Sequence, residues 1–322
     1  MKKLTGFLLL LLIGSLPLPA AERQMLIVLG LGGDPEYEQQ FKKDAELWRE
    51  AASEAGIRVR VIGDQADGGT LEELDQALET IEPDGNEEFW LILVGHGTAA
   101  GNDARFCLRQ EDVDAKALGA RLARFTRPMV IAALSACSAP FLQELAGPRR
   151  IVVTATRSAR QTNAPHFPTY FAERLQDPAA DLDGDDQTSV LEAFLAASAD
   201  TTQFFLQEQR VQSENALIED NADGIGASAD GFEGLSAPEP ADDEVSADGE
   251  RARRTALILS PLEAALTPEF RETRNELEQQ MAELRHQKNT LSIEEYYAKL
   301  EAIALQLAHL YAEAEASAES DS

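Results

Sequence analysis

Basic residues are scarce in this chain. Its 322 residues include 28 Lys and Arg against 57 Asp and Glu, which gives a formal net charge of −29. An acidic excess of this size repels the phosphates of nucleic acids and of anionic membranes, so we expect neither as a partner. Long apolar runs are also missing after the N-terminal segment. No later stretch reaches the roughly 18 apolar residues that a membrane span needs.

Cysteine and histidine are few as well, with two and four copies. His96 and Cys137 each follow closely on a short apolar run, at residues 89–94 and 129–134. Runs that are this short and evenly apolar favour buried parallel strands over amphipathic helices. Because sites in open parallel sheets form where strands end, His96 and Cys137 are a candidate catalytic dyad. The other three histidines are interpreted as ordinary surface or packing residues.

Cysteine-based catalysis needs a thiolate, a base and backbone N–H groups that stabilise an oxyanion. Gly97, directly after His96, lets the main chain approach a substrate closely. The second cysteine, Cys107, leaves an alternative open. Two cysteines in an oxidising compartment can form a disulfide, which would remove the nucleophile.

These motifs carry a resemblance. An apolar strand followed by His96-Gly97, and a second followed by Ala136-Cys137-Ser138, resemble the caspase-like fold of cysteine peptidases in its legumain-like branch. The resemblance covers residues 24–210 and implies an α/β fold, an αβα sandwich with a mainly parallel sheet. It also implies hydrolysis of peptide bonds in a protein or peptide substrate. His96 would be the base, Cys137 the nucleophile, and the N–H groups of Gly97 and Cys137 the oxyanion hole.

The sequence departs from the family pattern just after the nucleophile. The family usually has Gly two or three residues further on, whereas Ser138, Ala139 and Pro140 follow Cys137 here. An alignment anchored on Phe141 would place Ala136 in the nucleophile position. The alternative is therefore a catalytically inactive relative that acts as a calcium-stabilised module for binding other proteins.

A second motif predicts one structural calcium ion. Residues 181–192 place oxygen ligands at positions 1, 3, 5, 7, 9 and 12, as a calcium loop requires. The expected ligands are Asp181, Asp183, Asp185, the backbone carbonyl of Gln187, Ser189 and Glu192. Position 6, normally Gly at positive φ, is Asp186, and no second complete loop is found; residues 220–224 are only a fragment. Ser189 and Glu192 also fit a helix capping box without any metal.

The first 21 residues are typical of a secretory signal peptide. Lys2 and Lys3 supply a positive start, an apolar stretch follows, and Ala20 ends a small-residue cleavage motif. We therefore expect an exported protein, periplasmic or secreted, that has no membrane partner after cleavage.

The rest of the chain divides into three parts. Alternating strands and helices over residues 22–218 predict a parallel sheet covered on both faces. Residues 219–250 contain eleven acids and no Lys or Arg, which predicts a disordered linker. Residues 251–322 show helical apolar spacing and a capping box at Ser292 and Glu295, which predict a helical hairpin or coiled-coil tail. This tail is expected to dock on the core, bind a protein partner or self-associate.

Overall fold

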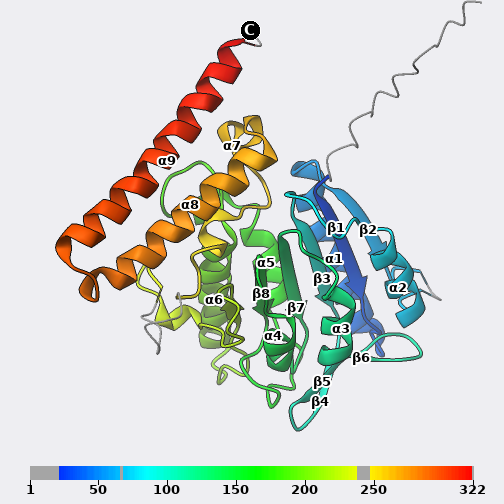
Figure 1. Ribbon diagram of the computed structural model, residues 1–322. Coiled ribbons are helices and arrows are strands. Elements are labelled where there is room, and N and C mark those ends of the chain that lie inside the picture. The colour runs from blue at the N-terminus through cyan, green and yellow to red at the C-terminus, as the bar shows by residue number, and fades with distance from the viewer. Residues whose placement is uncertain (1–21, 66–67, 238–246, 321–322) are drawn as a thin grey trace, which may run out of the picture.

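A central six-stranded sheet organises the protein in the computed structural model, which describes residues 22–65, 68–237 and 247–320. The strand order is β2-β1-β3-β7-β8-β9, and all neighbours are parallel except β8 and β9 (Figure 1). The strands are β1 Gln24–Leu29, β2 Arg58–Ile62, β3 Phe89–Val94, β7 Met129–Leu134, β8 Arg150–Thr154 and β9 Leu217–Glu219.

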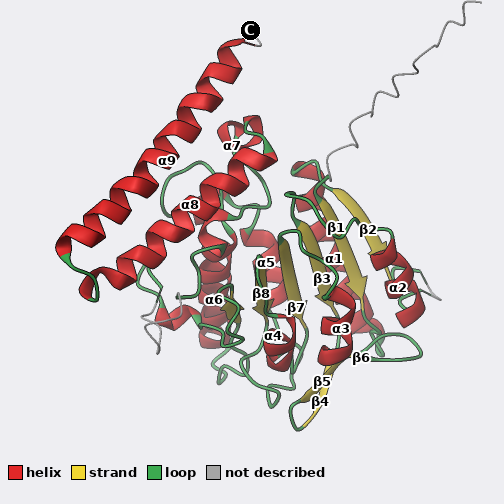
Figure 2. Cartoon of the chain, viewed as in Figure 1, coloured by secondary structure: helices red, strands yellow, loops and turns green. Residues whose placement is uncertain are grey.

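Helices cover both faces of the sheet (Figure 2). One face is covered by α1 Pro35–Glu54, α5 Phe167–Arg174 and α6 Val190–Gln207, and the other by α2 Leu71–Glu79, α3 Ala115–Leu122 and α4 Ala139–Leu145. Alternate residues of a strand point to opposite faces, so Trp90 packs in the first layer with Trp48, while Leu91 packs in the second with Leu118. This confirms the predicted α/β fold with a mainly parallel sheet.

A small antiparallel sheet, for which the sequence analysis gave no prediction, lies between β3 and α3 along the chain. It consists of β4 Gly97–Ala100, β5 Asp103–Phe106 and β6 Val113–Asp114. Strands of two to four residues carry too little periodicity to be recognised from sequence. Their consequence for the site is that Gly97 begins a strand directly after His96.

Residues 219–237 and 247–250, the described part of the predicted disordered linker, differ from that prediction. Glu219 ends β9, Ala227 forms a bridge with Ile218, and Asp220 and Asp248 are buried. Ala229–Gly231 forms a short 3-10 helix within this segment, and Ala252–Arg254 forms another just after it. The acidic composition gave a wrong prediction for these residues because Asp220 and Asp248 are buried and accept backbone hydrogen bonds instead of facing solvent. Residues 238–246, part of the same prediction, lie outside the described residues.

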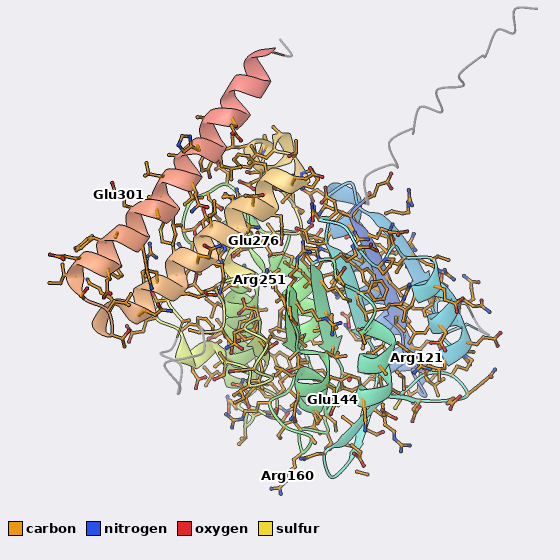
Figure 3. The ribbon with its side chains drawn as sticks, in the orientation of Figure 1. Arg121, Glu144, Arg160, Arg251, Glu276 and Glu301 are labelled. Carbon is orange, nitrogen blue, oxygen red and sulfur yellow. The ribbon has the colours of Figure 1, made fainter. Side chains whose placement is uncertain are left out.

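The chain ends in a helical hairpin, as predicted. After the short helix α7 Pro261–Ala265, the two legs are α8 Pro268–His286 and α9 Ile293–Ser320 (Figure 1). The capping box is present, because the Glu295 N–H donates to the Ser292 hydroxyl and the Ser292 N–H donates to the Glu295 carboxylate. Figure 3 shows charged side chains along both legs, among them Glu276 on α8 and Glu301 on α9.

Ion pairs attach α8 to the αβα core. Arg271 bonds to Glu87 at 3.1 Å and Arg149 to Glu272 at 2.9 Å. None of the described helices is long and apolar enough to cross a membrane. The predicted signal peptide, residues 1–21, lies outside the described residues.

Candidate active site

The ends of β3 and β7 lie side by side. The two strands pair in register up to Val94 and Leu134, so the segments that carry His96 and Cys137 leave the sheet at the same level. Gly97 packs directly against the β7 end. A Cβ at Gly97 would lie 2.1 Å from the carbonyl oxygen of Ala136. Only a residue without a side chain permits this approach, so the glycine is needed to bring the two strand ends together.

The His96 ring is held by the loop between β1 and α1. Its Nε2 lies 3.0 Å from the carbonyl oxygen of Gly32, and a carbonyl only accepts, so Nε2 carries the proton. The rings of Tyr37 and Phe41 pack edge-on against it, with centroids 4.7 Å and 5.0 Å away. In the neutral ring Nδ1 is therefore the nitrogen that can take a proton from a nucleophile.

Cys137 occupies a constrained position in the turn after β7. Its backbone has φ of 55°, and its N–H donates to the carbonyl of Gln161 at 2.9 Å. That N–H, which the resemblance assigns to an oxyanion hole, is thus already engaged. The residue is 1% exposed, and burial raises the pKa of its thiol. In this arrangement the thiol is neutral at pH 7 and no described hydrogen bond joins it to the His96 ring.

Cys107 lies at the same edge of the sheet. Its N–H donates to the carbonyl of His96 at 2.9 Å, and its carbonyl accepts from the N–H of Leu31. Burial is the main reason that the pKa of the Cys107 thiol is raised, and Asp112 and Cys137 raise it further. Both thiols are free in the structure. The site therefore contains two cysteines and one histidine.

The predicted calcium ligands are brought together in part. The carboxylates of Asp181, Asp183 and Asp185 offer oxygens that all lie within 4.8 Å of one another. The carboxylate of Asp181 accepts the N–H groups of Gly184 and Asp186 at 2.7 Å and 3.1 Å, which curls the loop around it. Asp186 takes the left-handed conformation expected at position 6, with φ of 64°.

The last two predicted ligands serve the helix that follows. Ser189 caps α6, and Glu192 accepts the Ser189 N–H at 2.8 Å, so the capping box is present. The other Glu192 oxygen accepts the N–H of Leu182 at 2.7 Å. The Glu192 carboxylate thus joins the start of the loop to its end. Gln187 at position 7 uses its side chain on Asp185 and leaves its carbonyl as the expected ligand.

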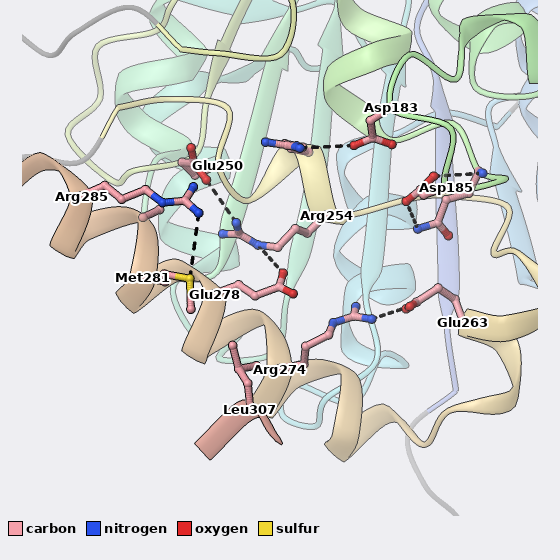
Figure 4. A pocket seen from close by; sticks show the side chains of 13 residues that line it. Asp183, Asp185, Glu250, Arg254, Glu263, Arg274, Glu278, Met281, Arg285 and Leu307 are labelled. Atoms are coloured by element: carbon pink, nitrogen blue, oxygen red, sulfur yellow. Dashed lines mark hydrogen bonds and ion pairs between the residues drawn. The ribbon is translucent and has the colours of Figure 1, made fainter. Parts of the chain in front are cut away.

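A cavity of about 370 Å³ separates this loop from the C-terminal hairpin. Figure 4 shows Asp183 and Asp185 on one side and Arg274, Glu278 and Met281 of α8 on the other. Its walls are mostly charged, and the charges are largely paired with each other. Among these pairs, Arg253 bonds to Asp183 at 3.4 Å.

Sequence reasoning missed the residues that hold the His96 ring and the Cys137 amide. Gly32, Tyr37 and Phe41 fix the His96 ring, and Gln161 binds the Cys137 amide. One signal was present, because Gly30, Gly32 and Gly33 follow the apolar run at residues 25–29. Gln161 lies in a loop far from Cys137 in sequence, so no local pattern marks it.

Comparison with known proteins finds structural neighbours but no family. Neither a protein-family model nor a curated protein matches the chain. The protein GSU0716 from Geobacter sulfurreducens is 13% identical, with a TM-score of 0.43, covering 62% of this chain and 92% of its own.

Two insect caspases give similar values. The Drosophila initiator caspase Dronc is 11% identical, with a TM-score of 0.41, covering 64% of this chain and 81% of its own. Caspase-1 from Spodoptera frugiperda is 10% identical, with a TM-score of 0.40, covering 62% and 86%. These likenesses are distant, so the fold class rests on the sheet topology given above and no activity passes from these proteins to this chain.

Proposed function

We propose that this protein is an exported cysteine-type endopeptidase of the legumain-like branch, with His96 and Cys137 as its catalytic dyad. One observation carries the proposal: Gly97 lies against the Ala136 carbonyl, so the residues that follow β3 and β7 share one sheet edge. The orientation of the ring supports it, because Nδ1 of His96 is the nitrogen without a proton.

In this mechanism Nδ1 of His96 takes the proton of the Cys137 thiol. The thiolate attacks the carbonyl carbon of a peptide bond, and the proton passes to the leaving amine. Water then hydrolyses the acyl-enzyme and restores the thiol. Because Cys137 is buried and its amide is bonded to Gln161, the loop after β8 must first move away from the β7 end. In this proposal the described arrangement would be a resting form.

The loop over residues 181–192 would hold one calcium ion in a structural role. Oxygen ligands from carboxylates and a backbone carbonyl suit this hard cation, and three carboxylates already converge there. Its place before α6 means that the ion would fix the start of that helix. It takes no part in the chemistry at Cys137.

A second candidate function is favoured by the burial of Cys137. A nucleophile that stays covered, with its amide engaged, would make the protein an inactive relative that binds other proteins. Its partner surface would be α9, whose Ile293 is 77% exposed and Tyr297 58% exposed. Such apolar residues suit a protein partner or a second copy of the hairpin.

Labelling with a thiol-reactive peptide probe separates the two functions. The full mature protein is incubated with the probe, with and without calcium, and the modified cysteine is mapped by mass spectrometry. A peptidase predicts selective labelling of Cys137 that falls strongly in His96→Ala but not in His309→Ala, a matched control on α9. Labelling of Cys107 alone, or equal labelling in both variants, would contradict the dyad.

A further inference from the structure

A second cavity, of about 240 Å³, lies beside the middle of α6. Its walls come from that helix, from residues 212–216 before β9, from residues 228–230 after β9 and from Phe167 at the start of α5. The volume is below the roughly 300–1,000 Å³ of pockets for drug-sized ligands, so an occupant would be small. The lining is polar, and it belongs to neither site described above.

The hydrogen-bond donors of this lining are mostly used within the protein. The hydroxyls of Thr201 and Thr202 donate to carbonyls of α6 at 2.8 Å and 3.0 Å. The side-chain amide of Gln212 donates to a backbone carbonyl at 2.8 Å, and the hydroxyl of Ser228 donates to the Asp230 carboxylate. Each of these four side chains still has an oxygen lone pair that can accept a hydrogen bond.

Asp230 adds a negative charge to the cavity wall. One of its oxygens accepts the Ser228 hydroxyl, which leaves the other for a ligand. The described residues that line the cavity include no Lys, Arg or His to neutralise this charge. Asn215 lines the same cavity, and its Oδ1 accepts the Gln161 amide at 2.8 Å, so its Nδ2 remains a donor. Acceptors therefore outnumber donors.

The hydroxyl of Ser198 is the clearest sign of a missing group. Its oxygen is buried, and among the described residues it has no hydrogen-bond partner. Ser198 precedes Thr201 and Thr202 by three and four residues, so the three hydroxyls lie on one face of α6. A buried polar atom without a partner costs free energy, so it marks a position that a ligand atom would fill.

We propose that this cavity binds a small primary amine as its ammonium ion. An alkylammonium group has three N–H donors and no acceptor, which matches a cavity rich in acceptors and negative in charge. The carboxylate of Asp230 would pair with it, and the hydroxyl of Ser198 would accept one of its hydrogen bonds. Phe167 and Ala216 supply an apolar part of the wall for the carbon chain. The net charge of −29 favours the approach of a cation over an anion.

The cavity lies at the sheet edge that also carries the proposed dyad. Leu217 pairs with Thr154, the last residue of β8, so residues 212–216 are at the carboxyl end of that strand. Asn215 holds the side chain of Gln161, whose carbonyl in turn accepts the N–H of Cys137. A bound amine would thus be next to the loop after β8. The binding proposal itself does not depend on peptidase activity or on calcium.

Butylamine hydrochloride is added at millimolar concentration to the full mature protein, and its binding is followed by saturation-transfer NMR. Butan-1-ol, which has the same chain without the charge, is the neutral comparison. Asp230→Asn keeps the shape of an exposed side chain and should weaken binding of the amine by at least about tenfold, the effect of losing one charge-assisted hydrogen bond. Glu233→Gln removes an exposed acid outside the cavity and should bind like wild type.

Absence of transfer to butylamine, or equal transfer to butylamine and butan-1-ol, would overturn the proposal. So would equal affinity for the amine in Asp230→Asn and Glu233→Gln, because overall charge would then explain the binding. Ser198→Ala decides the test if Asp230→Asn does not fold: it should weaken binding without lowering the Tm of the free protein, since this hydroxyl loses no described partner.

A last comparison identifies the source of the ammonium group. N-acetyl-lysine N-methylamide carries the same alkylammonium on a peptide backbone. If it binds more tightly than butylamine, the site accepts a lysine side chain of another protein. If it binds more weakly, the site accepts a free amine.

Discussion

Gly97→Ala tests the closest contact of the proposed active site. The new Cβ would lie 2.1 Å from the Ala136 carbonyl oxygen and 2.6 Å from the Ser135 hydroxyl oxygen. The first of these atoms belongs to the backbone, so no side-chain rotation relieves the clash. The ends of β3 and β7 must separate by about 1 Å to reach an ordinary contact distance. Overpacking of this kind destabilises a protein by about 1–3 kcal/mol, and a backbone neighbour places the expected value at the upper end.

Two measurements follow from this separation. Thermal unfolding should show a lower Tm, by about 2–4 °C for each kcal/mol in a domain of this size. Labelling of Cys137 by the peptide probe should slow by about two orders of magnitude, because a displacement of about 1 Å between catalytic groups has an effect of that size.

Gly147→Ala is the matched control. A Cβ at Gly147 would meet its nearest neighbour, the Cδ of Arg150, at 3.4 Å, which is an ordinary contact. This variant should unfold within about 0.5 kcal/mol of wild type. If Gly97→Ala proves as stable as Gly147→Ala and labels as fast as wild type, the strand ends do not approach as described and the geometric basis of the dyad is refuted.

Three further predictions concern single residues. Cys137→Ala should abolish peptidase activity, measured on a peptide library, while the calcium-dependent rise in Tm persists; loss of folding would instead mean that the thiol is structural. Asp181→Ala should remove part of the Tm rise on adding calcium and leave the Tm without calcium within a few degrees of wild type, so an unchanged calcium response would refute the loop assignment. Glu214, buried against the N–H groups of His166 and Phe167, has its pKa raised to about 7 from 4.5, mainly by burial. The folded state then holds a proton that the unfolded state releases, so this group stabilises the fold at acid pH and that contribution is lost as pH rises from about 4.5 through 7. Urea unfolding across this pH range should show a smaller loss in Glu214→Gln, and an identical pH profile would contradict the assignment.

The sheet was largely predictable from the sequence because its strands are short, evenly apolar runs with helices between them. The runs at 89–94 and 129–134 match β3 and β7 residue for residue. The small sheet after His96 escaped notice, since its strands alternate weakly and one of them is only two residues long. A local sequence pattern predicts a strand where burial on both faces requires a continuous apolar run. It fails where a strand is defined by only a few backbone hydrogen bonds.

The candidate site was predictable only in its strand-end residues. His96 and Cys137 follow recognisable strands, so their shared edge follows from topology. Gln161 and Gly32 act through backbone carbonyls, which any residue type supplies, so composition gives no sign of them. The acids at Glu219 and Asp248 were interpreted as solvated because sequence does not show that Asp220 collects backbone N–H groups and draws the segment into the core.

The 181–192 loop contacts the segment that leads into the C-terminal hairpin, which decides how an ion bound there would affect the tail. Asp183 pairs with Arg253, and Gln187 accepts the N–H of Ser260 through its side chain at 3.4 Å. A calcium ion at the loop would take the Asp183 carboxylate from Arg253, but it would use the backbone carbonyl of Gln187 and leave the Ser260 contact in place. The lost pair is partly exposed and contributes little. Because the Arg271 to Glu87 bond also joins α8 to the core away from this loop, the hairpin should stay docked whether or not calcium is bound.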